Sequence, residues 1–231
     1  RWWDARGFAR MPDPNRPVKR MPTFPAPVQS RLPDVGTTIF TVMSRLAQEH
    51  GAINLSQGFP DFNADDVLFE RVGHWMRAGH NQYAPMTGVE ALRGAIAAKV
   101  EGLYGTRYDR DSEITVTAGA TQALFTAVAA LVHPGDEVIV FEPVYDSYVP
   151  AITLQGGKVV RMRLQAPDYR PDWAAVRAAI GPRTRMVMIN SPHNPTATVW
   201  DADDMAELAA LTRDTGIVVV SDEVYEHIVF D

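Results

Sequence analysis

The stretch VVVSDEVYEHIVF, from Val218 to Phe230, sets an apolar run directly against two acids, Asp222 and Glu223. Three consecutive valines favour a β-strand, and an unbroken apolar run is typical of a strand buried on both faces. An ionised carboxylate at the end of such a strand costs free energy unless it is paired. Asp222 therefore lies either in a surface turn or beside a positive partner that is not part of the chain.

The residues before this stretch alternate between strand and helix patterns. Such alternation is typical of an α/β fold, in which a mostly parallel sheet carries helices on both faces. The apolar periodicity predicts strands over 113–119, 136–143, 158–164, 185–190 and 217–223, and helices over 120–132, 146–157, 172–181 and 201–216.

The first hundred residues have a different sequence pattern, without regular alternation of strands and helices. Residues 1–33 combine many prolines with scattered arginines, which predicts an extended arm or leader in front of a domain that covers residues 34–231. Within that domain the periodicity predicts further helices over 37–47, 67–76 and 92–103, and a short strand within 53–62. The chain starts with Arg1 and not Met, which suggests that the sequence is incomplete.

The amino-acid composition excludes several classes of function. The 231 residues carry a net charge of −6 and contain no cysteine, which excludes disulfides, thiolate catalysis and cysteine-ligated zinc. The bases are interspersed with acids, which argues against a nucleic-acid partner. No apolar run reaches the ~18 residues of a membrane helix, so we expect no membrane partner and a cytoplasmic location.

In an open α/β sheet, ligands bind beyond the carboxyl ends of the strands. The segments at those ends are TAGATQ, FEPVYDSY, NSPHNP and SDEVY, all rich in glycine, proline, aromatic or polar residues. No dinucleotide fingerprint, P-loop or G-x-S-x-G elbow follows a strand, and no metal-binding spacing such as H-E-x-x-H occurs. We therefore expect no metal.

Two of these segments have specific chemistry. In TAGATQ, Gly119 permits a tight turn, and the free N–H groups of Ala120 and Thr121 open a helix where an anion would bind. An ordinary capped helix would have the same pattern. In NSPHNP, two prolines restrict the backbone around Asn190 and Asn194, which predicts amides aimed at one fixed point.

Together these segments resemble the fold-type I aminotransferases, which use pyridoxal 5′-phosphate (PLP). The resemblance covers roughly residues 34–231 and is strongest to methionine and kynurenine aminotransferases. It implies the large, PLP-binding domain of that fold. The segments that carry it occur in the family's order: NLSQGFPDF, NQYAPMTG, TAGATQALF, FEPVYDSY, NSPHNPTATVW and SDEVYEH.

The resemblance implies a role for each candidate site residue. Asp222 would pair with the protonated ring nitrogen of PLP, which supplies the positive partner that its position requires. Asn194 and Tyr225 would bind the phenolic oxygen of the ring, and Tyr145 would stack on the ring. Gly119, Ala120 and Thr121 would hold the phosphate. Tyr83 would reach the phosphate in a neighbouring subunit, which implies a homodimer, and Gly58 would lie near the substrate carboxylate.

The lysine that the family attaches to PLP has no counterpart here. The three lysines of the chain are Lys19, Lys99 and Lys158, and none stands in a matching motif. By the resemblance, this lysine and the small C-terminal domain would follow residue 231. We therefore expect an N-terminal fragment that is inactive by itself.

The intact protein is expected to exchange an amino group between an amino acid, methionine or an aromatic one, and a 2-oxo acid. Two alternatives stay open. One is a PLP-dependent C–S lyase of the same fold. The other is a non-enzymatic protein that uses the PLP domain to bind an effector, although residues 1–33 do not supply the DNA-binding module that such a regulator needs.

Overall fold

The computed structural model describes residues 29–58, 60 and 62–230. The domain predicted over residues 34–231 stays a prediction. The arm predicted over residues 1–33 lies almost entirely outside the described residues, so its conformation and its role stay predictions.

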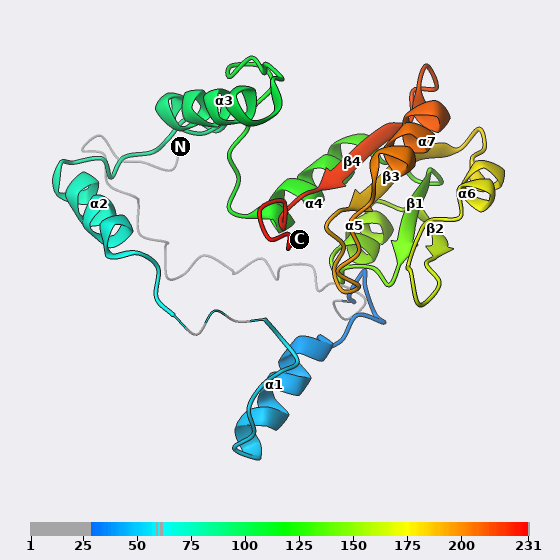
Figure 1. The fold of residues 1–231 in the computed structure, drawn as a ribbon, viewed down its shortest axis with the longest axis horizontal. Coiled ribbons are helices and arrows are strands. Elements are labelled where there is room, and N and C mark those ends of the chain that lie inside the picture. Colours follow the sequence, from blue (N-terminus) through cyan, green and yellow to red (C-terminus); the bar gives the residue numbers. More distant parts are fainter. Residues whose placement is uncertain (1–28, 59, 61, 231) are drawn as a thin grey trace, which may run out of the picture. The chain divides into compact units, whose positions relative to one another are not determined.

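Four parallel strands form the central sheet, in the order β2-β1-β3-β4 (Figure 1). Parallel strands require long crossover connections, and a helix lies in each of them. The expected α/β class is therefore confirmed, and the carboxyl ends of the strands share one edge. The strands are β1 (Glu137–Glu142), β2 (Lys158–Arg163), β3 (Thr184–Asn190) and β4 (Val218–Asp222); the helices around them are α4 (Ala120–Leu131), α5 (Tyr148–Leu154), α6 (Trp173–Ala179) and α7 (Ala202–Thr212).

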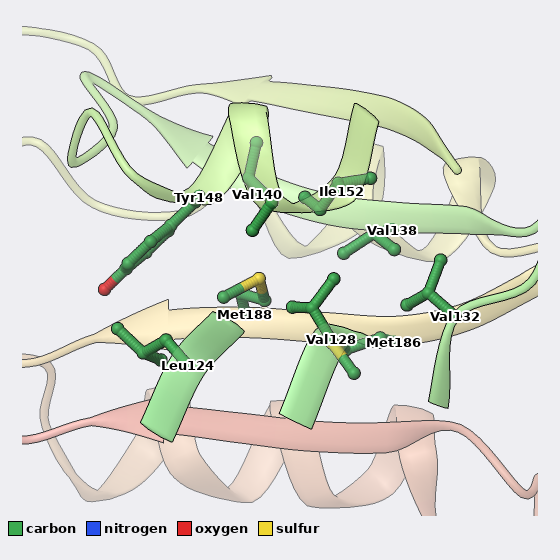
Figure 2. Packing of buried hydrophobic residues seen from close by; sticks show 10 residues of the cluster. Leu124, Val128, Val132, Val138, Val140, Tyr148, Ile152, Met186 and Met188 are labelled. Carbon is green, nitrogen blue, oxygen red and sulfur yellow. The ribbon is translucent and has the colours of Figure 1, made fainter. Parts of the chain in front are cut away.

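Both faces of the sheet are covered, because successive strand residues point to opposite sides. On one face, Val138 and Val140 of β1 pack with apolar residues of α4 and α5 (Figure 2). On the other face, Ile139 and Phe141 of β1 pack with residues of α6 and α7. β1 and β3 are central strands and are buried almost throughout, which fixes the position of the strand ends that follow them.

Three helices precede this region, and all three were predicted: α1 (Ile39–Glu49), α2 (Asp66–Arg77) and α3 (Glu90–Tyr104). Thr38 and Asp65 cap the first two through their side chains. Neither α1 nor α2 buries a residue, and α3 buries only Arg93. No described helix has the length and the apolar content that crossing a bilayer requires.

Two predicted strands are wrong. Residues 113–119 are irregular, and the Val116 N–H donates to the Thr87 carbonyl at 2.9 Å instead of to a neighbouring strand. In the described part of 53–62 the backbone is a loop, where the Asn54 side chain accepts the Ser56 N–H at 3.0 Å and so forms a turn. An alternating pattern suits a strand but does not supply the partner that a strand needs.

The expectation that the strand before Asp222 is buried on both faces is also wrong. β4 is an edge strand, and its exposure alternates along its length, with Val219 37% exposed. Val220 packs against the cluster shared with α4 and α5. The valine run reflects strand preference and one buried face.

Candidate functional site

A small cavity of about 110 Å³ lies where the ends of β3 and β4 meet the start of α4. The edge of the sheet supplies its polar groups, because three loops leave the strands there. The lining consists of Ala120, Thr121, Leu124, Tyr145, Asn190, Asn194, Asp222, Val224 and Tyr225. Six of the nine predicted site residues are among them, and a seventh, Gly119, directly precedes Ala120.

The amino end of α4 has the properties of an anion site. Its N-cap, Gly119, has φ 90° and ψ 164°, and no side chain caps the helix. The first N–H groups of a helix have no intrahelical partner, so those of Ala120 and Thr121 remain available for a ligand in the cavity. A Cβ on Gly119 would meet no atom within 4 Å, so a glycine is required here by its positive φ.

Asp222 ends β4 and is half-buried in this cavity. Its Oδ2 accepts the Tyr148 hydroxyl at 2.6 Å, and its Oδ1 accepts the Val224 N–H at 3.3 Å. No cationic side chain is among the lining residues. The charge of the carboxylate is therefore met by neutral donors, and the cavity has room for a positive ligand group beside it.

The loop after β3 is fixed by Asn190. Its side-chain Nδ2 donates to the Asp222 carbonyl at 2.9 Å, and its Oδ1 accepts the Asn194 N–H at 2.7 Å. Asn190 and Asn194 both line the cavity, as the sequence predicted, and the Asn190 amide also joins β3, its loop and β4. The Asn194 side chain is free to contact the cavity, and its Nδ2 lies 3.3 Å from the Tyr225 hydroxyl.

His193 is a buried residue of the same loop, and its side chain contacts another residue of that loop. Its imidazole is buried, and Nδ1 lies 2.7 Å from the Thr196 hydroxyl. Burial lowers the pKa of His193, while a hydrogen bond to the Pro143 carbonyl acts in the opposite direction. A neutral imidazole therefore joins the loop after β3 to the loop after β1.

Tyr145 lines the cavity and contacts a second tyrosine, Tyr148, which begins α5. Tyr145 is half-buried, and its ring meets that of Tyr148 edge to face, with centroids 5.9 Å apart. Sequence reasoning singled out Tyr145 but missed Tyr148. Tyr145 lies in the turn that precedes α5, and the Tyr148 N–H donates to its carbonyl at 3.2 Å. The sequence signal for Tyr148 was that it belongs to the same strand-end segment, FEPVYDSY.

Two predicted residues lie outside the cavity. Tyr83 is fully exposed in the loop between α2 and α3, and a Cβ on Gly58 would meet no atom within 4 Å. Their assigned partners, a second subunit and a substrate, are not tested by the geometry of one chain. Their roles therefore stay predictions.

Neither described lysine belongs to the cavity. Lys99 is about half exposed on α3 and pairs with Glu226 at 3.0 Å, as well as lying 2.9 Å from His227 Nε2. Lys158 opens β2 and is exposed. Lys19 lies outside the described residues.

A second hollow of about 450 Å³ adjoins the first and shares Asn194 and Tyr225 with it. Its other lining residues are mostly apolar and include Ile228 and Phe230. Within the described ranges, no group of three or more His, Cys, Asp or Glu side chains is arranged to hold a metal ion.

Comparison with known proteins places this geometry in a family. Residues 50–231 match the family model described as aminotransferase class I and II. The chain is 61% identical over 202 residues to the methionine aminotransferase of Escherichia coli, a match that covers 87% of the chain and 52% of that protein. It is 45% identical over 205 residues to a probable N-succinyldiaminopimelate aminotransferase of Mycobacterium tuberculosis, covering 87% of the chain and 51% of that protein.

Solved structures agree with these relatives. The structure of YbdL from Escherichia coli, for which a methionine aminotransferase function was identified, superimposes with a TM-score of 0.85 at 60% identity and covers 88% of this chain and 53% of that one. A Thermus thermophilus aspartate aminotransferase gives 0.81 at 32% identity, covering 89% and 55%. The chain spans about half the length of the relatives it matches. Its matched residues make up most of the chain, and it belongs to the class I and II aminotransferases.

Proposed function

We propose that this chain forms the PLP-binding part of an aminotransferase. Aminotransferases of class I and II depend on PLP. The observation that carries the proposal is the placement of a half-buried carboxylate, Asp222, in the same small cavity as the uncapped start of α4.

The donor set of the cavity fits PLP. Free N–H groups at a helix start suit a phosphate, and a carboxylate that meets no cationic side chain among the residues lining the cavity suits a protonated ring nitrogen. A flat aromatic ring that carries both groups satisfies the two ends together, and Tyr145 offers a ring for it to stack on. Asn194 and Tyr225 place an amide and a hydroxyl in the same cavity, where they would hydrogen-bond the phenolic oxygen.

When bound, PLP supplies an electron sink for the carbanion that forms at the substrate. The chain contributes the arrangement that makes this sink effective. Asp222 would keep the ring nitrogen protonated, and the N–H groups of Ala120 and Thr121, with the Thr121 hydroxyl, would anchor the phosphate. Gly58 would lie near the substrate carboxylate.

For the whole protein we propose transfer of an amino group from methionine or an aromatic amino acid to a 2-oxo acid. The identity of 61% to a methionine aminotransferase supports this substrate class. A further relative, the kynurenine–oxoglutarate transaminase 1 of Rattus norvegicus, is 34% identical over 87% of the chain and 51% of that protein. We also propose a cytoplasmic homodimer in which Tyr83 serves the neighbouring subunit's phosphate.

By itself this chain should bind PLP without a specific covalent bond, because Lys99 and Lys158 lie away from the cavity. The test is borohydride reduction of the chain in the presence of PLP, followed by peptide mapping. We expect no stoichiometric label on any lysine and no turnover of methionine with a 2-oxo acid. A stoichiometric label on one lysine together with turnover would contradict this.

The proposed role of Asp222 is tested by Asp222→Ala in a version of the chain extended to the length of its relatives. Loss of one charge-stabilising contact in a preorganised site should lower turnover roughly 100-fold, equivalent to about 3 kcal/mol. Asp168→Ala, which removes an exposed carboxylate near β2, is the matched control and should leave turnover unchanged. Unaltered turnover in Asp222→Ala would refute the role of Asp222. Release of a thiol product by the extended wild-type protein, in place of amino transfer, would indicate the lyase alternative.

A further inference from the structure

The Asp222 carboxylate has few groups to fix its orientation. The terminal torsion of an aspartate side chain is broad, so a carboxylate in a partly open cavity turns freely unless donors hold it. Among the described residues, the two side-chain hydrogen bonds that Asp222 makes are the short one from Tyr148 and the long one from Val224, at 2.6 and 3.3 Å. The Tyr148 hydroxyl is therefore the stronger restraint.

Tyr148 is itself held rigidly. It is 3% exposed, and its ring is part of the cluster that α5 forms with Val140 and Met188. Figure 2 shows the ring inside this cluster, with the hydroxyl oxygen pointing out of it. A phenol that is clamped by the core presents its oxygen at one place, so the hydrogen bond ties a core position to Asp222, which lies 74 residues further along the chain.

The direction of this hydrogen bond is fixed. Burial, followed by the hydrogen bond to Asp222, raises the pKa of Tyr148, and the nearby Tyr145 and Tyr225 act in the same direction. The phenol therefore stays protonated at neutral pH and donates, while the carboxylate accepts. A carboxylate has about four acceptor positions, so one donor on Oδ2 and one on Oδ1 leave it able to accept another hydrogen bond from a ligand.

We propose that Tyr148 is a positioning residue that holds the Asp222 carboxylate in the one orientation that receives the ring nitrogen of PLP. This inference rests on the proposed function, because it assumes that PLP is the ligand of the cavity. Tyr148 touches no reacting atom and acts only through Asp222. A tyrosine that served only the core would stabilise the fold and leave the ligand's electronic state unchanged.

The test uses this chain and deoxypyridoxine phosphate, an analogue that keeps the ring nitrogen and the phosphate but lacks the aldehyde, so that no lysine is needed. Its affinity is measured by calorimetry for the wild type, Tyr148→Phe, Asp222→Ala and the double variant. Tyr148→Phe keeps the ring in the core and removes only the donor. Tyr169→Phe, in a partly buried tyrosine that packs on the opposite face of the sheet, is the matched control.

We expect Tyr148→Phe to weaken binding roughly tenfold, the cost of one hydrogen bond to a charged group, and Tyr169→Phe to leave it unchanged. In the Asp222→Ala background, Tyr148→Phe should have no further effect, because its partner is already missing. A general loss of stability caused by Tyr148→Phe would weaken binding both in the wild type and in the Asp222→Ala background. The comparison of the fold-change in affinity between these two backgrounds therefore remains informative even if Tyr148→Phe folds less well.

A second readout is the ¹⁵N chemical shift of the ring nitrogen in isotopically labelled analogue, which reports its protonation. Tyr148→Phe should move this shift toward the value of the unprotonated ring, in the same direction as Asp222→Ala. If the wild type binds the analogue and Tyr148→Phe changes neither its affinity nor this shift, the inference is overturned and the proposed function stands. If the wild type binds no analogue, the proposed function fails and the inference fails with it.

Discussion

Helices α1 and α4 have nearly the same length, 11 and 12 residues, but they differ in how much of their surface is buried. α4 buries Leu124 and Val128 against the sheet, whereas α1 buries nothing, although its apolar residues recur at helical spacing. A helical pattern therefore predicts that a helix forms, but burial depends on whether a matching surface is present. Helical stability in proteins comes mostly from that packing.

The same contrast separates two larger regions. From α4 to β4, two core clusters fill both faces of the sheet. From α1 to α3, large apolar side chains are exposed, among them Ile39 at 63% and Trp75 at 51%. The free energy of unfolding should therefore depend mainly on the sheet region, and truncation of exposed side chains in α1 to α3 should alter it much less.

The largest expected difference comes from one substitution made in both regions. Ile139→Ala removes a fully buried side chain from β1 and should lower the free energy of unfolding by about 2–5 kcal/mol. Ile39→Ala makes the same change in α1 and should alter it by less than about 0.5 kcal/mol. Urea denaturation of both variants measures the difference, and equal losses would show that α1 is packed in the folded protein.

A pair of glycines provides a second comparison of the two regions, with a smaller expected change in the free energy of unfolding. A Cβ at Gly157 would lie 2.8 Å from Val132 Cγ1 and 2.9 Å from Ile152 Cγ2, so Gly157→Ala should destabilise the sheet region by about 1–3 kcal/mol through overpacking. A Cβ at Gly102 in α3 would meet nothing within 4 Å. Gly102→Ala should therefore stabilise α3 by roughly 0.5–1 kcal/mol through helix propensity.

Circular dichroism during thermal unfolding distinguishes the two glycine variants. We expect a lower midpoint for Gly157→Ala and an unchanged or slightly higher helix signal for Gly102→Ala. A stable Gly157→Ala variant would show that Val132 and Ile152 move aside at little cost.

The smallest effect concerns pH. Burial lowers the pKa of His193 in the folded chain, so between that value and about 6.5 the unfolded chain binds more protons than the folded chain. The contribution of neutral His193 to stability is therefore fully present above pH 6.5 and is lost as the pH falls toward the folded pKa. His193→Gln should make stability less dependent on pH in this range.

The wild type is the reference for this prediction. Denaturation midpoints measured at several pH values between 5 and 7 provide the comparison. An unchanged slope in His193→Gln would mean that the imbalance in bound protons arises elsewhere.

Patterns along the chain were enough to predict most of the fold. Seven helices and the four strands β1 to β4 follow side-chain periods that depend only on near neighbours, and the order of the motifs indicated the family. Strand ends carrying Asp222, Asn194 and Tyr145 could be assigned to one site, because parallel strands end on one edge of a sheet.

Other features were decided only when distant segments met. The pattern of residues 113–119 suits a strand, but Val116 found its hydrogen-bond partner at Thr87, and β4 became an edge strand because no described strand covers its outer side. The bond from Tyr148 to Asp222 joins residues 74 positions apart. A local pattern encodes which conformation a segment prefers, whereas hydrogen-bond partners and burial depend on contacts that exist only in the folded chain.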